Sequence, residues 1–262
     1  MKQIDIDYNN VDFIPDGANY PERWMNDARA YRETEAAIGR ARLNVPYGPG
    51  ERQKLDLFYP AGKPEGLVVF VHGGYWLKFD RSVWSHFAAG LTSAGWVVAM
   101  PSYTLAPDAR IHEITREIAR AIEVAGDMVQ GPIRLAGHSA GGHLVARMGC
   151  RDVVLQVRDR VRRILPISPL SDLRPLMDTS MNEGLRLDTK EAEAESPVLH
   201  AAPEAPVTVW VGADERPVFL DQTRWLVDAW NAEHRIDPGR HHFDVIDGLR
   251  DAASPLVQAL LS

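Results

Sequence analysis

The chemistry that this sequence offers centres on a serine in a glycine-flanked turn, Gly137-His138-Ser139-Ala140-Gly141. The five residues follow a short apolar run at 133–136 and precede a helical pattern, so they form a turn from a strand into a helix. Small residues allow so sharp a turn, and the serine hydroxyl then projects at the carboxyl edge of a sheet. We therefore interpret Ser139 as a nucleophile; a tight turn with an unused serine is the alternative.

A second glycine-rich turn, His72-Gly73-Gly74-Tyr75-Trp76, follows the apolar run at 67–71. A loop at this position can supply backbone N–H groups to the oxyanion of a tetrahedral intermediate. We expect the N–H groups of Gly74, Tyr75 and Ala140 to do so, with Gly73 shaping the turn. His72 is a possible base by residue type, but a histidine here more often braces its loop.

A serine hydroxyl needs a base, and the base needs a carboxylate to orient it. The segment Gly212-Ala213-Asp214-Glu215 follows the apolar run at 207–211, and the usual spacing of three residues after the glycine favours Glu215 as the acid. Asp214 is the alternative, because adjacent side chains on an extended segment point opposite ways. A zinc site at His241 and His242 is a rival reading, but adjacent histidines rarely face one ion and no further metal motif accompanies them. We expect no metal and no cofactor.

These residues must be positioned by a mostly parallel sheet, because short apolar runs alternate with longer helical patterns. The predicted strands are 67–71, 97–100, 133–136, 164–167 and 207–211, with 54–58 as a half-buried edge strand and 242–246 as a last strand or the loop leaving it. The predicted helices are 20–38, 82–94, 111–129, 140–150, 217–232 and 252–261. Helices would then cover both faces of the sheet, as in the α/β-hydrolase fold.

Length and composition fit one domain over residues 1–262, since 45% of the residues are hydrophobic and no linker or repeat divides the chain. We expect residues 1–45 to be a helical N-terminal elaboration and residues 171–199 to be a small lid-like insertion. Formal net charge is −7 and no segment concentrates Lys or Arg, so nucleic acid is not an expected partner.

Cys150 is the only cysteine, which excludes an intramolecular disulfide and fits a reducing compartment; it reads as a small buried apolar residue. The N-terminus is polar, and no apolar run approaches the roughly 18 residues of a membrane span. We therefore expect a soluble cytoplasmic protein without a membrane partner. The sequence leaves the oligomeric state open, and a homodimer is compatible with it.

Taken together, the two turns and the pair His242-Phe243 resemble the kynurenine formamidase (arylformamidase) branch of the α/β-hydrolases. Further similarity lies at 47–59, 102–107 and 168–187, so the resemblance covers most of the chain. Around the acid the match is looser, because Glu215 is followed by Arg216-Pro217-Val218-Phe219 where relatives often carry an aspartate followed by Ser-Pro-Glu-Phe. The branch places its catalytic histidine immediately before the phenylalanine, which implies His242 as the base and leaves His241 as the alternative.

The resemblance implies a serine hydrolase that cleaves a small ester or amide substrate, such as an N-formyl aromatic amine, through an acyl-enzyme. Trp76 and Tyr103 could then stack on an aromatic leaving group, with burial in the core as their alternative role. A general short-chain carboxylesterase or thioesterase is the second hypothesis. The third is a non-catalytic ligand-binding module that has kept the hydrolase scaffold.

Overall fold

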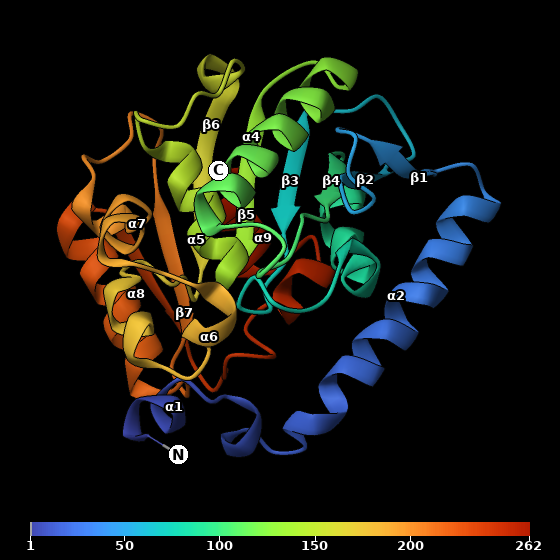
Figure 1. Cartoon of the computed structure of the whole chain (residues 1–262). Coiled ribbons are helices and arrows are strands. Elements are labelled where there is room, and N and C mark those ends of the chain that lie inside the picture. The colour runs from blue at the N-terminus through green and yellow to red at the C-terminus, as the bar shows by residue number, and fades with distance from the viewer. Residues whose placement is uncertain (1) are drawn as a thin grey trace.

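The computed structural model describes residues 2–262, and a twisted sheet runs through its centre (Figure 1). Within these residues the sheet has eight strands in the order β1-β2-β4-β3-β5-β6-β7-β8. The first two neighbouring pairs in this order are antiparallel and the others are parallel. The strands are β1 (Ala41–Pro46), β2 (Lys54–Phe58), β3 (Leu67–Val71), β4 (Val97–Pro101), β5 (Ile133–His138), β6 (Val161–Ile167), β7 (Thr208–Gly212) and β8 (Glu233–Asp237).

Helices cover both faces of the sheet, as expected for an α/β-hydrolase fold (Figure 1). Successive side chains of a strand point to opposite faces, so Val69 joins one core cluster, with α4 and α5, while Phe70 joins another, with α3 and α9. The helices are α1 (Gln3–Asp7), α2 (Tyr20–Ala37), α3 (Ala89–Ser93), α4 (Ile111–Met128), α5 (Ala140–Gly149), α6 (Asn182–Leu185), α7 (Thr189–Ala194), α8 (Pro217–Trp230) and α9 (Pro255–Leu261).

The two edges of the sheet differ from the sequence-based expectation. The strand predicted at 54–58 is β2, but β1 pairs with its outer side, so β2 is an interior strand and four of its five residues are buried. At the other edge the last strand is β8, whereas residues 242–246 form turns. The two missed strands differ: β1, Ala-Arg-Leu-Asn-Val-Pro, has the alternation of a half-buried strand but lies at the end of the region expected as a helical elaboration, whereas β8 is the mostly exposed Glu-His-Arg-Ile-Asp and has no such alternation. The helix predicted at 82–94 is α3 preceded by two short 3₁₀ segments.

Helix α2 packs against the 3₁₀ segments at 81–88 and against the edge strand β1 through one face, on which Trp24 and Ala28 are buried. A buried carboxylate fixes it there: Asp56 on β2 accepts hydrogen bonds from the Arg32 guanidinium of α2 and, at 3.1 Å, from Arg81 Nε. The other bond to Asp56 comes from a backbone N–H of the β1 segment, at 2.7 Å. Because the carboxylate is fully buried, its charge depends on these partners for compensation.

Two segments lie at the carboxyl ends of the parallel strands, where α1 and α6 are seen at the lower edge of Figure 1. The first comprises residues 2–19 and the second residues 171–199. They hold each other: Lys2 Nζ donates to the Asp178 carbonyl at 2.9 Å, and the Ser180 N–H donates to the Asp5 carboxylate at 2.6 Å. In the segment expected as a lid, Leu176 and Leu185 are buried, so it is packed into the core.

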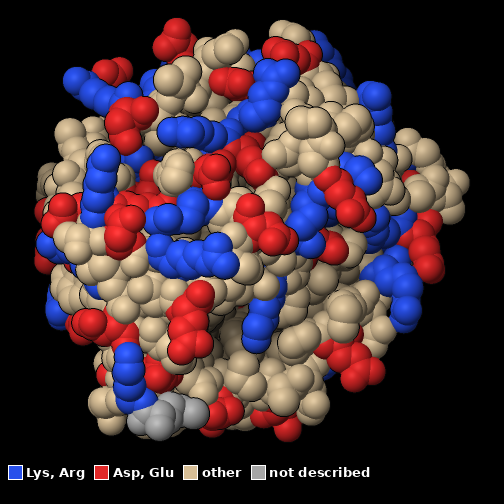
Figure 2. Space-filling view, in the orientation of Figure 1, with Lys and Arg blue, Asp and Glu red and all other residues tan. Residues whose placement is uncertain are grey.

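The surface carries charges of both signs. On the face in Figure 2 acidic and basic side chains are interspersed, and no continuous basic stripe crosses it. Among residues 2–262, no helix combines the length and the apolar character needed to cross a membrane.

We expect Asp56→Ala to destabilise the fold by about 3 kcal/mol, because it leaves two half-buried guanidinium groups without their carboxylate. Asp27→Ala is the matched control: Asp27 pairs with Arg250 at 3.1 Å on the exposed surface, and its loss should cost about 1 kcal/mol or less. Urea denaturation of the wild type and both variants measures the difference. Equal effects of the two substitutions would contradict the role given to Asp56.

A second prediction concerns His86, whose side chain is 4% exposed and whose ring nitrogens find no hydrogen-bond partner within residues 2–262. Burial lowers the pKa of His86 to about 4, so the unfolded chain binds the proton more readily. Stability is therefore retained above pH 6.5 and falls progressively toward pH 4. Between pH 7 and pH 5 this should cost the wild type about 2 kcal/mol, and His86→Leu should lose that much less. Unfolding curves that shift equally with pH would refute the assignment.

Candidate active site

Ser139 lies on a strained turn between β5 and α5. Its backbone has φ 57° and ψ −117°, a conformation that a non-glycine residue adopts only when its surroundings impose it. A side chain on Gly141 would place its Cβ 2.0 Å from the carbonyl oxygen of Val71, so the second glycine of the motif is required for helix and strand to approach. The turn thus has the geometry that the sequence pattern predicted.

Glu215 and His242 form a buried pair next to this turn. His242 Nδ1 lies 2.6 Å from a Glu215 carboxylate oxygen, and since a carboxylate only accepts, Nδ1 carries the proton and Nε2 is left as an acceptor. The other Glu215 oxygen accepts from the Ser168 hydroxyl and from the Gly212 N–H at 3.1 Å. The carboxylate is therefore held at both oxygens, and the imidazole is held by it.

The structure distinguishes the alternatives that the sequence left open for these two positions. Asp214 is exposed, whereas Glu215 is 6% exposed and contacts the histidine. His241 is engaged elsewhere: its Nε2 lies 3.1 Å from the Tyr20 hydroxyl and its Nδ1 3.1 Å from Asp244. Geometry thus brings Glu215 and His242 together, and neither Asp214 nor His241.

A pocket of about 420 Å³ opens beside these residues, and both Ser139 and His242 line it. Both residues line the pocket, but within residues 2–262 no hydrogen bond joins Ser139 Oγ to His242. Such bonds often tighten only when a substrate is bound.

The glycine-rich loop after β3 packs directly against the serine. A Cβ on Gly73 would lie 3.1 Å from Ser139 Cβ, and Gly74 has φ 114°, which L side chains rarely adopt. Tyr75 follows with φ 54° and donates its hydroxyl to the Tyr8 carbonyl at 2.6 Å. In the part of the chain that is described, the backbone N–H groups of Gly74, Tyr75 and Ala140 have no acceptor. These are the three donors that the sequence suggested for an oxyanion.

His72 and His138 are buried beside the site and are neutral. Burial lowers the pKa of His72 to about 4 and the pKa of His138 well below its usual value. His72 stacks on Tyr103 and donates from Nδ1 to the Gly73 carbonyl at 2.7 Å, so it braces the loop as expected. His138 Nε2 donates to the carbonyl of His242 at 2.8 Å and so fixes the backbone of the candidate base.

The expectation that Trp76 and Tyr103 contact an aromatic leaving group is wrong for this structure. Both side chains are 0% exposed, and neither lines the pocket. Trp76 packs edge-on against His143, and the Tyr103 hydroxyl donates to the His72 carbonyl at 3.1 Å. They support the loop from behind, in the alternative role as core residues.

Other aromatic residues form the pocket wall instead, and sequence reasoning missed them. They come from segments far apart in the chain: Tyr8, Trp24, Tyr75, Phe79, Trp84 and Phe243. The N-terminal segment, residues 2–19, also contributes Asn9 and Asn10, and the segment at 171–199 contributes Ser180 and Met181. The periodic pattern of 20–38 indicated a buried face for α2, but nothing in the sequence showed that this face reaches the serine.

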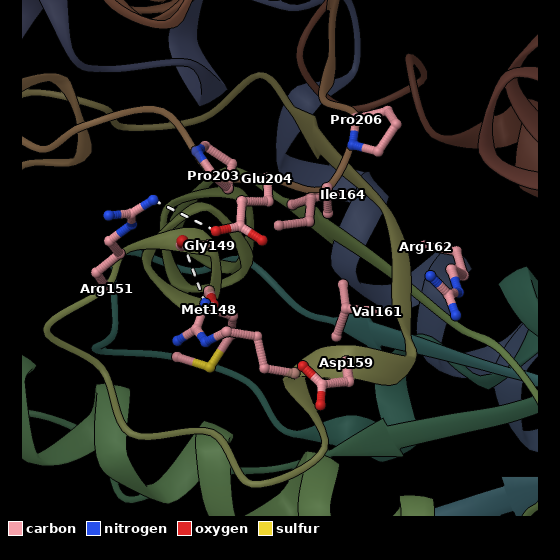
Figure 3. Close-up of a pocket in the computed structure, with 12 residues that line it drawn as sticks. Met148, Gly149, Arg151, Asp159, Val161, Arg162, Ile164, Pro203, Glu204 and Pro206 are labelled. Atoms are coloured by element: carbon pink, nitrogen blue, oxygen red, sulfur yellow. Dashed lines mark hydrogen bonds and ion pairs between the residues drawn. The ribbon is translucent and has the colours of Figure 1, made fainter.

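A larger cavity, of about 470 Å³, lies away from these residues at the start of β6 (Figure 3). Two of its three arginines are engaged: Arg158 donates to four backbone carbonyls, and Arg151 pairs with Glu204 at 3.3 Å. Its lining residues include no serine, cysteine or histidine, so we place the candidate site at the smaller pocket that contains Ser139 and His242.

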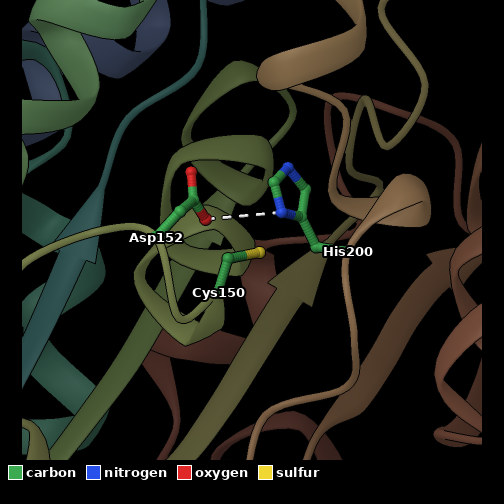
Figure 4. A group of neighbouring side chains, drawn as sticks. All are labelled: Cys150, Asp152 and His200. Atoms are coloured by element: carbon green, nitrogen blue, oxygen red, sulfur yellow. Dashed lines mark ion pairs between the residues drawn. The ribbon is translucent and has the colours of Figure 1, made fainter.

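One group of possible metal ligands, Cys150, Asp152 and His200, lies together near the end of α5 (Figure 4). Its donor set does not suit an ion. Asp152 is bound by both terminal nitrogens of the buried Arg147, at 3.1 and 2.5 Å, and burial raises the pKa of the Cys150 thiol to about 11. A metal would have to displace the guanidinium and deprotonate the thiol.

Comparison with known proteins agrees with the fold. A family model described as the α/β hydrolase fold matches residues 68–216, more than half of the chain. The chain therefore belongs to the α/β-hydrolase family.

Two curated relatives narrow the family further. A kynurenine formamidase of Salmo salar is 29% identical over 249 residues, which cover 87% of this chain and 84% of the relative. A kynurenine formamidase of Drosophila melanogaster is 30% identical over 228 residues, with 78% and 75% coverage. The chain is a kynurenine formamidase-like member of the α/β-hydrolase family.

Solved structures give the same fold. The crystal structure of a protein provisionally described as a thioesterase, from Silicibacter sp. TM1040, has a TM-score of 0.97 and 53% identity, and the match covers 100% of both chains. Esterase B of Lactobacillus rhamnosis has a TM-score of 0.68 at 18% identity, with 91% of this chain and 92% of that one covered, and shares the fold.

The contrast between the two neighbouring acids is testable. If Glu215 orients the base, Glu215→Gln should lower kcat for a short-chain aryl ester by about 10³–10⁴-fold, because an amide favours the wrong tautomer of His242. Asp214→Asn, which changes an exposed carboxylate one residue away, should lower kcat less than about threefold. Steady-state kinetics of the two variants decide between the acids, and a large loss on Asp214→Asn alone would reverse the assignment.

Proposed function

We propose that the chain is a serine hydrolase that cleaves a small ester or amide substrate through an acyl-enzyme, with an N-formyl aromatic amine as the leading substrate class. The observation that carries the proposal is the buried Glu215–His242 pair, at 2.6 Å, whose histidine lines the same pocket as Ser139. The kynurenine formamidase relatives support the amide, and the esterases that share the fold support ester cleavage as well.

In the acylation step Ser139 Oγ attacks the carbonyl carbon of the substrate while His242 Nε2 accepts its proton. Glu215 stabilises the imidazolium that forms, because its carboxylate lies against Nδ1. The C–O or C–N bond then breaks, and the leaving alcohol or amine takes the proton from His242. The serine ester of the acyl group remains.

Water reverses these roles in the second step. It attacks the serine ester as His242 removes a proton, and the carboxylic acid departs when the proton returns to Ser139 Oγ. The N–H groups of Gly74, Tyr75 and Ala140 stabilise the oxyanion in both steps; each such donor is typically worth a factor of about 10²–10³ in kcat. This role rests on their lack of other acceptors in the described chain.

The aromatic wall favours an aryl leaving group, because flat rings gain contact area and edge-to-face attraction against Trp24 and Trp84. A short-chain esterase or thioesterase is the second candidate, since the 53% identical structure is provisionally described as a thioesterase. A non-catalytic binding module is the third candidate. It is disfavoured because such a module would not need Glu215 to orient His242.

The direct test is formate release from N-formylkynurenine by the wild type and by Ser139→Ala, with short-chain p-nitrophenyl esters and thioesters run in parallel. We expect formate release by the wild type and a loss of about 10⁶-fold in kcat for the alanine variant. A fluorophosphonate should label the wild type at Ser139, and mass spectrometry of the labelled peptide locates the adduct.

The outcomes separate the candidates. Ester or thioester cleavage without formate release would give the second function. Failure to label, together with no turnover of any substrate, would favour the binding module. Full activity in Ser139→Ala would refute the proposed mechanism.

A further inference from the structure

Three residues that line the pocket have a buried polar side-chain atom without a partner within residues 2–262: Asn10 through its amide oxygen, Trp84 through Nε1 and His138 through Nδ1. Of these, Asn10 offers a side-chain oxygen, which accepts hydrogen bonds. Its side chain is 5% exposed and lines the pocket, and its amide oxygen has no hydrogen-bond partner within residues 2–262. A buried acceptor without a donor costs stability, so an unpaired one in a binding pocket points to a bound group that satisfies it.

The local backbone makes this more specific. Asn10 is the N-cap residue of a 3₁₀ turn, Val11–Phe13, where an asparagine side chain normally accepts from a backbone N–H of the turn. Here its side chain makes no such bond. The neighbour Asn9 does that work instead: its amide oxygen accepts from the Asp12 N–H at 3.4 Å, and its amide nitrogen donates to the Asp12 carboxylate at 2.7 Å.

The surroundings of Asn10 decide what it can recognise. The wall that it shares is mostly apolar, with Trp24, Phe79 and Trp84 among the lining residues, and it also includes the charged residues Asp5 and Lys78. Next to apolar side chains, a buried amide oxygen discriminates between a group that donates a hydrogen bond and a group of the same shape that does not.

We propose that Asn10 is a specificity-determining residue whose amide oxygen accepts a hydrogen bond from an N–H or ammonium donor on an aryl leaving group. The inference rests on the proposed function, since it names the substrate class of that same site. It separates aryl amines and amino-substituted aryl esters from plain aryl and alkyl esters as substrates.

Matched aryl acetates test the proposal without relying on a formamide. The 3- and 4-aminophenyl acetates carry a donor, and the 3- and 4-methylphenyl acetates have nearly the same size without one. We expect the wild type to prefer the amino member of at least one pair, with the preference measured as a ratio of kcat/KM values. In Asn10→Leu this ratio should fall by about 10- to 100-fold, mainly through KM.

Two further variants make the test sharp. Asn10→Asp retains an acceptor oxygen and should keep the preference for the amino substrates. Asn26→Leu is the matched control: Asn26 is an exposed residue of α2 that does not line the pocket, and its amide oxygen accepts from Arg29 at 2.7 Å, so its loss should keep the preference ratio within about threefold. Asn10→Leu should not lower the melting temperature, because its amide caps nothing.

The possible results of these assays test the role of Asn10 and the proposed hydrolase function separately. If the wild type cleaves all the acetates without preference, or if Asn10→Leu slows both members of a pair equally, the role of Asn10 is refuted while the hydrolase function stands. Loss of the preference in both Asn10→Leu and Asn10→Asp would refute the acceptor role. If the wild type cleaves none of the acetates and no formamide, the proposed function itself fails.

Discussion

The backbone conformation of Ser139 is the constraint on which the rest of the site depends. Holding a non-glycine residue at φ 57° and ψ −117° costs about 1–3 kcal/mol, and the surrounding structure must supply it. The Ser139 N–H donates to the Ile167 carbonyl at 2.8 Å, and its carbonyl accepts from the His143 N–H at 3.0 Å. These bonds to strand β6 and helix α5 hold the backbone of Ser139 from two sides.

Much of this arrangement could be predicted from sequence, because local rules govern it. A short apolar run, a glycine-flanked serine and an amphipathic helix together permit one local geometry, and the structure has it at β5 and α5. The turn after β7 that carries the candidate acid was predictable for the same reason. The choice between Asp214 and Glu215 was not, because it depends on which side of one turn faces inward.

The pocket wall lay beyond prediction for a different reason. Its aromatic residues come from the N-terminal segment, from α2, from the loop after β3 and from the turns at 242–246, and their proximity is a property of the assembled fold. Trp76 and Tyr103 lie close to the motifs in sequence and were therefore expected to contact the substrate. Both are buried behind the loop after β3, where they support its conformation. The edge strand β8 was missed because it is mostly exposed and its sequence has no apolar alternation.

The N-terminal segment gives the order of synthesis a consequence for this enzyme. Residues 5–11 are synthesised before the residues that they contact: the Tyr8 hydroxyl accepts from the Gln222 amide at 3.0 Å, and Phe243 lines the same pocket. The segment can therefore reach its final position only after α8 and the residues after β8 have been translated. The pocket that contains Ser139 is complete only at that stage, because its wall is built from segments far apart in the chain.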